Sequence, residues 1–311
     1  MVRLIVALLL IGASCFVSYN YVEHHEKGAM ESLYMHLMPA PLITGGGDHG
    51  PIEYIVALPL PAALTAFANN TAQMHDGADP VAAFTNLQLF QVLSVLLIFV
   101  LLSGVPKHIR TGQGDVITRF FAGFALWVRD DIVFPVMVKE RGGQFLPYFL
   151  MVFFFIMFMN VLGLVPGSAT ATASIYVTAG LALTTLLAML GCGMVAQGPI
   201  AFWKNLVPHV PLAIWPLMFF VEVFGLIVKP IALTIRLFAN MTGGHLVVLS
   251  FIGLIFTFAQ LSPVIGYASA PFAVGFAIFI MIIESFVALL QAYIFTQLSV
   301  LFVDASVHPE H

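Results

Sequence analysis

The sequence predicts an all-α polytopic membrane protein with about five core transmembrane helices, of which the last two form a long, tilted hairpin. Hydrophobic residues make up 60% of the 311 residues and charged residues only 8%, whereas a soluble domain carries about 25% charged residues. Several apolar runs reach the length of about 20 residues that a helix needs to cross the hydrocarbon core. These runs are far longer than the alternating segments of a membrane β-barrel.

Composition indicates the lipid bilayer as a partner and points to no cofactor. Cys15 and Cys192 lie in separate apolar runs, which indicates neither a disulfide framework nor a metal site. The histidines within residues 20–85 match no metal-ligand spacing. No basic cluster suggests nucleic acid.

The N-terminal part is predicted to be exported. Residues 1–19 carry the positive charge of Arg3 near their start and continue as an apolar run followed by small residues, which is typical of a signal peptide or a signal anchor. Residues 20–85 form a more polar exported segment, and residues 86–311 form the transmembrane domain.

The first core span is expected at residues 87–105. The segment from there to Arg141 holds six of the eleven Lys and Arg residues, so this loop is expected to be cytoplasmic. Its two apolar stretches are too short to span, and we expect a helix lying in the membrane interface. Spans at 145–165 and 175–196 follow, and Asn160 and the Ser and Thr residues of 168–174 are interpreted as helix–helix hydrogen bonds.

The segment 215–260 is too long for one upright span. As a single helix it is about 69 Å long, against a hydrocarbon core about 30 Å thick. It either breaks into two spans near residues 242–244 or crosses at a steep tilt. We favour the tilted helix, because no polar connector divides the segment. A turn at 261–271 and a second overlong helix at 271–303 complete the expected hairpin.

Ionisable residues inside this hairpin are the main functional signal. Glu222, Lys229 and Arg236 are spaced seven residues apart, and Asn240 follows one turn later. Positions seven residues apart on a helix differ by only about 20° around its axis, so these residues lie along one stripe of the helix surface. A charged residue at the bilayer centre costs about 2.5–3.5 kcal/mol even on insertion scales. His245 lies about half a turn away.

The final helix carries matching polar residues. Glu284 and Gln291 are also seven residues apart. In an antiparallel hairpin with its turn near residue 266, His245 lies opposite Glu284, and Asn240 lies opposite Gln291. His and Glu can bind and release protons in such surroundings, whereas Arg stays charged. Arg236 is thus predicted to separate a proton path through His245 and Glu284 from one near Glu222.

Structural interpretations of the same residues stay open. Lys229 can snorkel to the interface, and Asn240 and Gln291 can serve only to join helices. Glu284 can be a purely structural ion-pair partner of His245. A structural role for Arg236 is harder to support, because no acid lies at helical i+3 or i+4 spacing from it.

The motif KPIALTIRLFANMTGGH at 229–245, followed by ESFVALLQAYIFTQLSVLF at 284–302, resembles subunit a of the F-type rotary ATP synthases. The resemblance covers about residues 85–303. It implies two long tilted helices that wrap a ring of c subunits, with b subunits and the F1 sector as further partners. It also implies two offset half-channels, with protons as the expected ion and Na⁺ as the alternative, in a bacterial inner membrane rather than a mitochondrial one.

The resemblance also implies roles for individual residues. Arg236 matches the essential arginine that faces the ring carboxylate, and Glu222 matches the acid of the cytoplasmic half-channel. Lys229 matches a common family lysine of uncertain role. Polar residues of the outer half-channel match Asn240, His245, Glu284 and Gln291. Many bacterial members have the acid and the histidine in exchanged positions, an exchange that keeps the same chemical pair.

The sequence therefore predicts a non-catalytic, ion-translocating subunit of an ATP synthase. A self-contained ion-coupled secondary transporter is the alternative, although such a protein is expected to contain an inverted repeat, and none is visible. A membrane enzyme is disfavoured because the chain lacks a nucleophile or metal motif.

Overall fold

The computed structural model describes residues 2–21, 86–137, 139–165, 170–206 and 214–307. The described part is all-helical, and five of its helical stretches are long and apolar enough to cross a membrane. These are Leu87–Thr111, Lys139–Gly163, Ile175–Gln197, Trp215–Leu261 and Pro263–Val307. The predicted fold class is thereby confirmed. Nearly all of the exported segment predicted at 20–85 lies outside the described residues.

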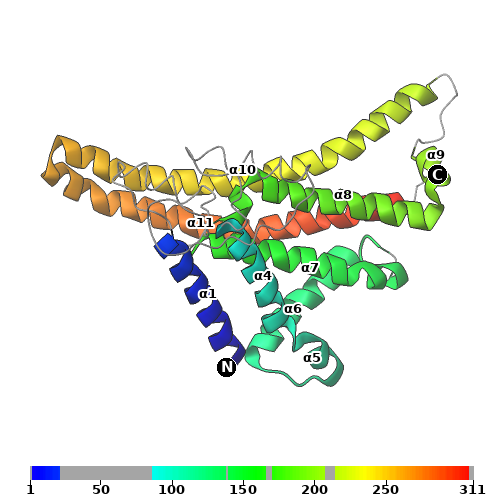
Figure 1. The fold of residues 1–311 in the computed structure, drawn as a ribbon, viewed down its shortest axis with the longest axis horizontal. Coiled ribbons are helices and arrows are strands. Elements are labelled where there is room, and N and C mark those ends of the chain that lie inside the picture. The colour runs from blue at the N-terminus through cyan, green and yellow to red at the C-terminus, as the bar shows by residue number, and fades with distance from the viewer. Residues whose placement is uncertain (1, 22–85, 138, 166–169, 207–213, 308–311) are drawn as a thin grey trace, which may run out of the picture.

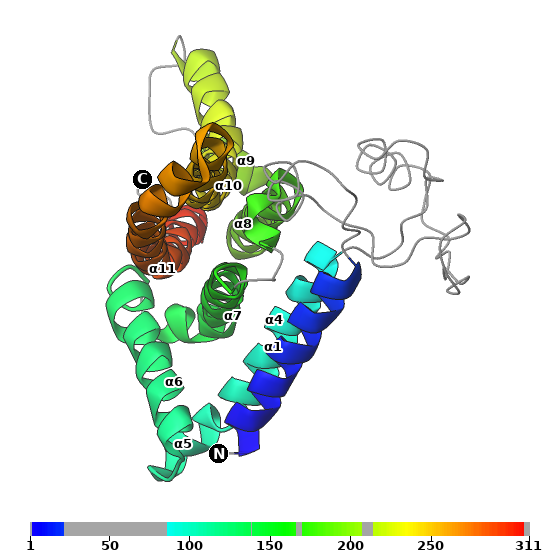
Figure 2. The same cartoon turned by 90° about the vertical axis from the view of Figure 1, so that its left-hand side faces the viewer.

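The first core span is α4 (Asn86–Leu102), and α1 (Val2–Tyr21) lies beside it (Figure 2). The loop that follows is helical, as predicted, and consists of α5 (Val105–Thr111), α6 (Val116–Trp127) and a π-helix, η1 (Val128–Val133). Gly112 ends α5 at φ 69°, a left-handed conformation that glycine adopts without steric cost. Whether α6 lies in the membrane interface stays a prediction.

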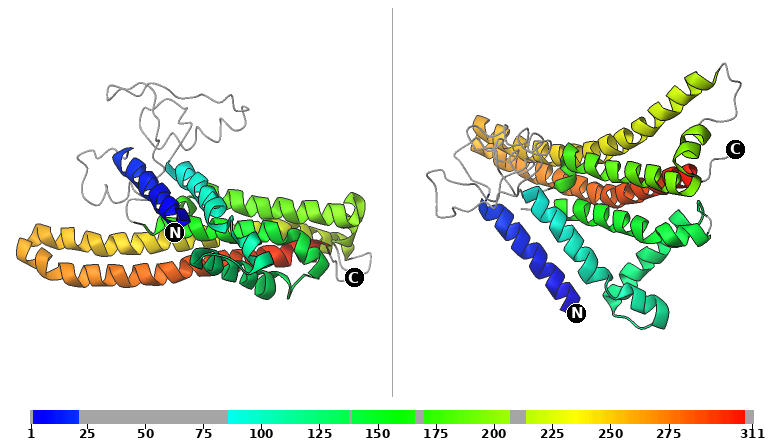
Figure 3. Two further views of the ribbon diagram at one scale, coloured as in Figure 1. Left: turned by 90° about the horizontal axis from the view of Figure 1, so that it is seen from below. Right: turned by 45° about the vertical axis from the view of Figure 1, so that its right-hand side comes forward.

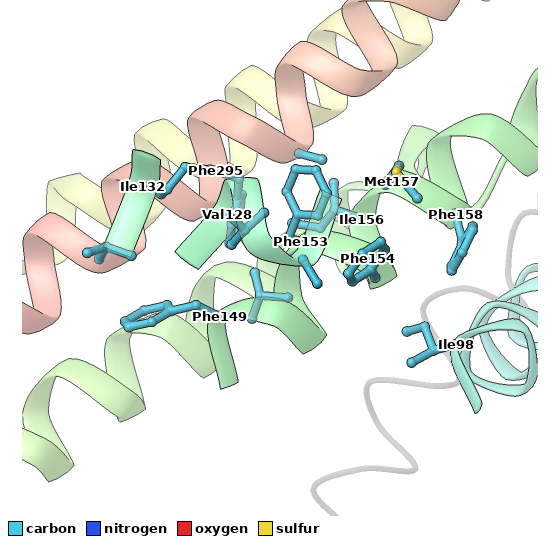
Figure 4. Close-up of a cluster of buried hydrophobic side chains, with 14 of the residues drawn as sticks. Ile98, Val128, Ile132, Phe149, Phe153, Phe154, Ile156, Met157, Phe158 and Phe295 are labelled. Carbon is cyan, nitrogen blue, oxygen red and sulfur yellow. The ribbon is translucent and has the colours of Figure 1, made fainter. Parts of the chain in front are cut away.

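The core of the protein forms around α7 (Lys139–Gly163), which packs against α4, η1 and α11 (Pro263–Val307). Figure 4 shows Phe149, Phe153 and Phe154 of α7 in one buried cluster with Val128 and Ile132 of η1 and Phe295 of α11. Phe154 also meets Phe121 of α6 edge to face, with ring centroids 6.1 Å apart. In a bilayer such van der Waals packing holds helices together, because the lipid tails are as apolar as the side chains.

The helices α8 (Ile175–Gln197), α9 (Pro199–Asn205) and α10 (Trp215–Leu261) complete the fold. The long helix α10 is unbroken, so the alternative of two spans divided near 242–244 is wrong. It bends, and its N-terminal end diverges from α8 and α11, while the rest lies along α11 (Figure 1). Pro230 lies inside this helix, and interior prolines are a common cause of such bends.

The hairpin turn is shorter than predicted. Ser262 alone separates α10 from α11, and Pro271, predicted to end the turn, lies inside α11. A Cβ added to Gly266 would approach Ala259 Cβ to 2.7 Å, so the two helices already touch there through small residues. Pro263 starts α11, a position that suits proline because its missing N–H would have no helical partner. The hairpin tip projects beyond the other helices (Figure 3).

Candidate functional site

A buried ion pair lies inside the hairpin, near the short helix η2 (Ala171–Ala173). His245 Nε2 of α10 is 3.6 Å from Glu284 Oε1 of α11. The Glu284 side chain is 4% exposed and the His245 side chain 18%. A buried carboxylate needs a cation or hydrogen bonds to stay charged, and protonated His245 is placed to be that cation. The contact predicted from the hairpin register is confirmed.

Thr170 belongs to this site although sequence reasoning did not assign it there. Its Oγ1 is 2.8 Å from His245 Nε2 and donates a 3.2 Å hydrogen bond to the Gly163 carbonyl. A hydroxyl has a single proton, so when Thr170 donates to Gly163, His245 Nε2 is the donor toward Thr170. The same N–H then lies between the hydroxyl and the Glu284 carboxylate. Thr170 therefore favours the form of His245 that carries a proton on Nε2.

Gly244 provides the space that Glu284 occupies. A Cβ added to Gly244 would lie 2.5 Å from Glu284 Oε1 and 2.6 Å from its Cδ. Nothing lies within 4 Å of the equivalent atom on Gly243. The two adjacent glycines thus differ: only Gly244 needs to lack a side chain for the carboxylate to reach His245.

Other buried polar atoms lie on the elements around this pair. Asn160 Nδ2 of α7 donates to the Ala288 carbonyl of α11 at 3.2 Å, one turn beyond Glu284, so its interpretation as a helix–helix hydrogen bond is confirmed. Thr242 donates to the Ala173 carbonyl at 3.4 Å. Asn160 Oδ1, Thr172 Oγ1 and both Glu284 carboxylate oxygens are buried without a hydrogen-bond partner among the described residues.

Arg236 lies on the outer face of the hairpin. Its side chain is exposed among apolar neighbours that are exposed too, including Ile231 and Ile235. Within the described part of the chain, no carboxylate forms an ion pair with it. A cation on an apolar face, with no acid from the described part of the chain, is an arrangement that suits an acidic partner.

The other predicted residues are divided between the inside and the outside of the hairpin. Asn240 is exposed beside Arg236, whereas Gln291 is 4% exposed. The structure contains no hydrogen bond between these two residues, which were expected opposite each other. Glu222 is half-buried near the start of α10. Lys229, also half-buried, lies with Nζ 5.3 Å from the centroid of the Phe302 ring, a cation–π contact.

No group of three or more His, Cys, Asp or Glu side chains able to hold a metal occurs in the described ranges. The site is an ion pair with its hydrogen-bonding neighbours inside the hairpin, and Arg236 on the outer face of the hairpin. Such a site can bind and release protons.

Comparison with known proteins identifies relatives of this chain. The family model for the ATP synthase A chain matches residues 88–304. ATP synthase subunit a of Myxococcus xanthus (strain DK1622) is 47% identical over 205 residues, which are 66% of this chain and 65% of that protein. Subunit a of Chloroherpeton thalassium is 48% identical over 169 residues, 54% of this chain and 49% of that protein. Subunit a of Anaeromyxobacter dehalogenans (strain 2CP-C) is 40% identical over 215 residues, 68% of this chain and 54% of that protein. The chain spans about half to two thirds of the length of these curated relatives.

Proposed function

The chain belongs to the ATP synthase A chain family, and from this premise we propose that it is the stator subunit of a rotary ATP synthase. It carries protons to and from a ring of c subunits through two offset half-channels, and so couples proton flow to rotation and ATP synthesis. The chain itself is non-catalytic. Its partners are the ring, the b subunits and, through them, the F1 sector.

The exposed position of Arg236 carries this proposal. An arginine on an apolar membrane face is costly unless a partner compensates its charge. A ring whose carboxylates pass this face supplies that partner one subunit at a time. Because Arg236 cannot release its proton, it favours the ionised form of each passing carboxylate and blocks direct proton leakage between the two half-channels.

His245 and Glu284, with Thr170, form the outer half-channel in this proposal. The pair can accept a proton from outside and pass it toward the ring face, where Asn240 lies beside Arg236. Gln291 is buried and lies seven residues beyond Glu284 on α11. These titratable groups support protons, with Na⁺ as the alternative ion.

Glu222 is proposed as the acid of the cytoplasmic half-channel. It lies two heptads before Arg236, on the stripe that reaches the start of α10. Lys229, between them, contacts Phe302, which supports a structural role. We place the protein in a bacterial plasma membrane, as a multi-pass protein, because the relatives named above come from bacteria.

A self-contained secondary transporter remains the alternative. In such a protein the essential charges face the bundle interior or a water-filled cavity. Glu284 fits that expectation, whereas the exposed Arg236 does not. The alternative predicts ion-coupled uptake by the purified chain alone.

The test uses the assembled complex in inverted membrane vesicles. Arg236→Ala should abolish ATP-driven proton pumping while the complex still assembles, as measured by co-purification of its other subunits. Arg110→Ala, which removes an exposed arginine from α5, is the matched control and should pump normally. Coupled pumping retained by Arg236→Ala would refute the proposal, and uptake by the chain without a ring would favour the transporter.

A further inference from the structure

A partly open, apolar cavity of about 420 Å³ lies between α1, α4, α6 and α7. Its walls are side chains without a polar atom, among them Leu8 of α1, Leu101 of α4, Phe120 of α6 and Val161 of α7. Its volume falls in the range of about 300–1,000 Å³ that is usual for ligand sites. No residue of the proposed proton path lines it, so the function proposed above leaves this cavity unexplained.

A cation lies at one end of the cavity. Arg3 precedes Leu4, which lines the wall, and Arg3 Nη1 donates a 3.1 Å hydrogen bond to Thr118 Oγ1 of α6. The guanidinium lies directly against Gly104, where a Cβ would overlap it. Among the described residues, Arg3 forms no ion pair with a carboxylate. The arginine is thus held between three helices with its charge uncompensated by the described chain.

The surrounding residues add to this positive charge. Lys107, Arg110 and Arg119 follow Gly104 in the sequence and are exposed, and Asp115 is the single acidic residue among residues 104–119. Basic pockets between transmembrane helices on the cytoplasmic side are typical sites for the head groups of anionic lipids. An occupant that complements both the apolar walls and the positive charge at their end is an amphiphile with an apolar tail and a negative head.

We propose that this cavity binds an anionic phospholipid, with one acyl chain between α1, α4, α6 and α7 and the phosphate on Arg3. The lipid fills the apolar space and neutralises the arginine. The site also requires α1 to remain in the mature protein as a signal anchor, because α1 supplies both Arg3 and one wall.

The size of the cavity disfavours a helix of another subunit as the occupant. A helix is about 10 Å wide and rises about 1.5 Å per residue. The space between the four helices, about 420 Å³, therefore encloses only about four residues of such a helix. An acyl chain is thinner and follows an irregular channel without leaving backbone polar groups unpaired in the membrane.

The test is photolabelling of the assembled complex in lipid nanodiscs. Phosphatidylglycerol and phosphatidylcholine, each with the same diazirine-bearing acyl chain, are compared by mapping the labelled peptides. Phosphatidylglycerol should label α1, α4 and α6 preferentially. Arg3→Gln should lower that labelling about fivefold, the order expected for one cation near an anionic lipid, without changing labelling by phosphatidylcholine. Arg110→Gln, which removes an exposed cation that does not line the cavity, should have a smaller effect.

A second variant fills the cavity instead of removing the positive charge. Val161→Trp should reduce labelling by both lipids, whereas Val195→Trp, on the exposed face of α8, should not. Equal labelling by the two lipids that is insensitive to Arg3→Gln would overturn the proposal. So would a crosslink from Val161→Cys to another subunit, or an intact mass showing that the mature chain lacks α1. None of these results bears on the role proposed for Arg236.

Discussion

Replacing Gly244 by alanine tests whether the position of Glu284 matters for proton flow. The new methyl group would lie 2.5 Å from Glu284 Oε1, about 1 Å closer than van der Waals contact allows. The carboxylate must then move away from α10 and from His245. Overpacking of this kind costs about 1–3 kcal/mol, which lowers the population of the observed pair between about fivefold and 150-fold.

The assay is ATP-driven proton pumping by the assembled complex in inverted vesicles, with subunit co-purification as the measure of assembly. Gly244→Ala should slow pumping by a factor within that range. The helix itself should not be weakened, because alanine is favoured over glycine in a helix by about 1 kcal/mol. A loss of assembly would be a different result and would point to misfolding.

Gly243→Ala is the matched control, since nothing lies within 4 Å of its added methyl group. It makes the same chemical change one residue earlier and should leave pumping unchanged. Shortening the acid in the double variant Gly244→Ala/Glu284→Asp should recover part of the lost activity. The reasoning fails if Gly244→Ala pumps as well as Gly243→Ala.

Three further outcomes are expected. Thr170→Val should slow pumping and shift its pH profile, because it removes a hydrogen bond worth about 1 kcal/mol, while Thr170→Ser should keep the wild-type profile. Lys229→Gln should leave pumping intact and lower thermal stability by about 0.5–1 kcal/mol, with no additional loss when Phe302→Leu is added. Arg129 donates to Asp130 outside the spans and thereby lowers the pKa of that carboxyl. The pair therefore stabilises the fold above the ordinary pKa of Asp130, and this small contribution should be lost as pH falls through the lowered pKa, or at any pH in Arg129→Gln, as measured by thermal melting.

Periodicity and length predicted those parts of the fold that depend on one helix or on one hairpin. The pairing of His245 with Glu284 was predicted from antiparallel register with a turn near residue 266, and the contact is present although the turn lies at Ser262. The turn itself was placed too late, since Gly266 and Ala259 let the helices touch at once. Pro271 was expected at the start of the last helix but lies inside α11.

The missed residues depend on contacts between distant segments. Thr170 reaches His245 across 75 residues, and no local pattern in 168–174 indicates which helix it meets. Gly244 appeared to be a possible helix break, whereas its role depends on a side chain from α11. The separation of exposed Asn240 from buried Gln291 also depends on how the two helices rotate about their axes, which a seven-residue spacing leaves undetermined.

Because α10 is one continuous helix, it fixes the distances between the functional residues along it. Glu222 and His245 are 23 residues apart in one helix, so they are held about 35 Å apart along its axis, with Arg236 at a fixed point between them. Inserting one residue between Glu222 and Arg236 would rotate the two by about 100° relative to each other. A seven-residue insertion would keep both on one face but lengthen the interval by about 10 Å. Evolution can therefore vary the side chains along this helix far more freely than it can vary their number.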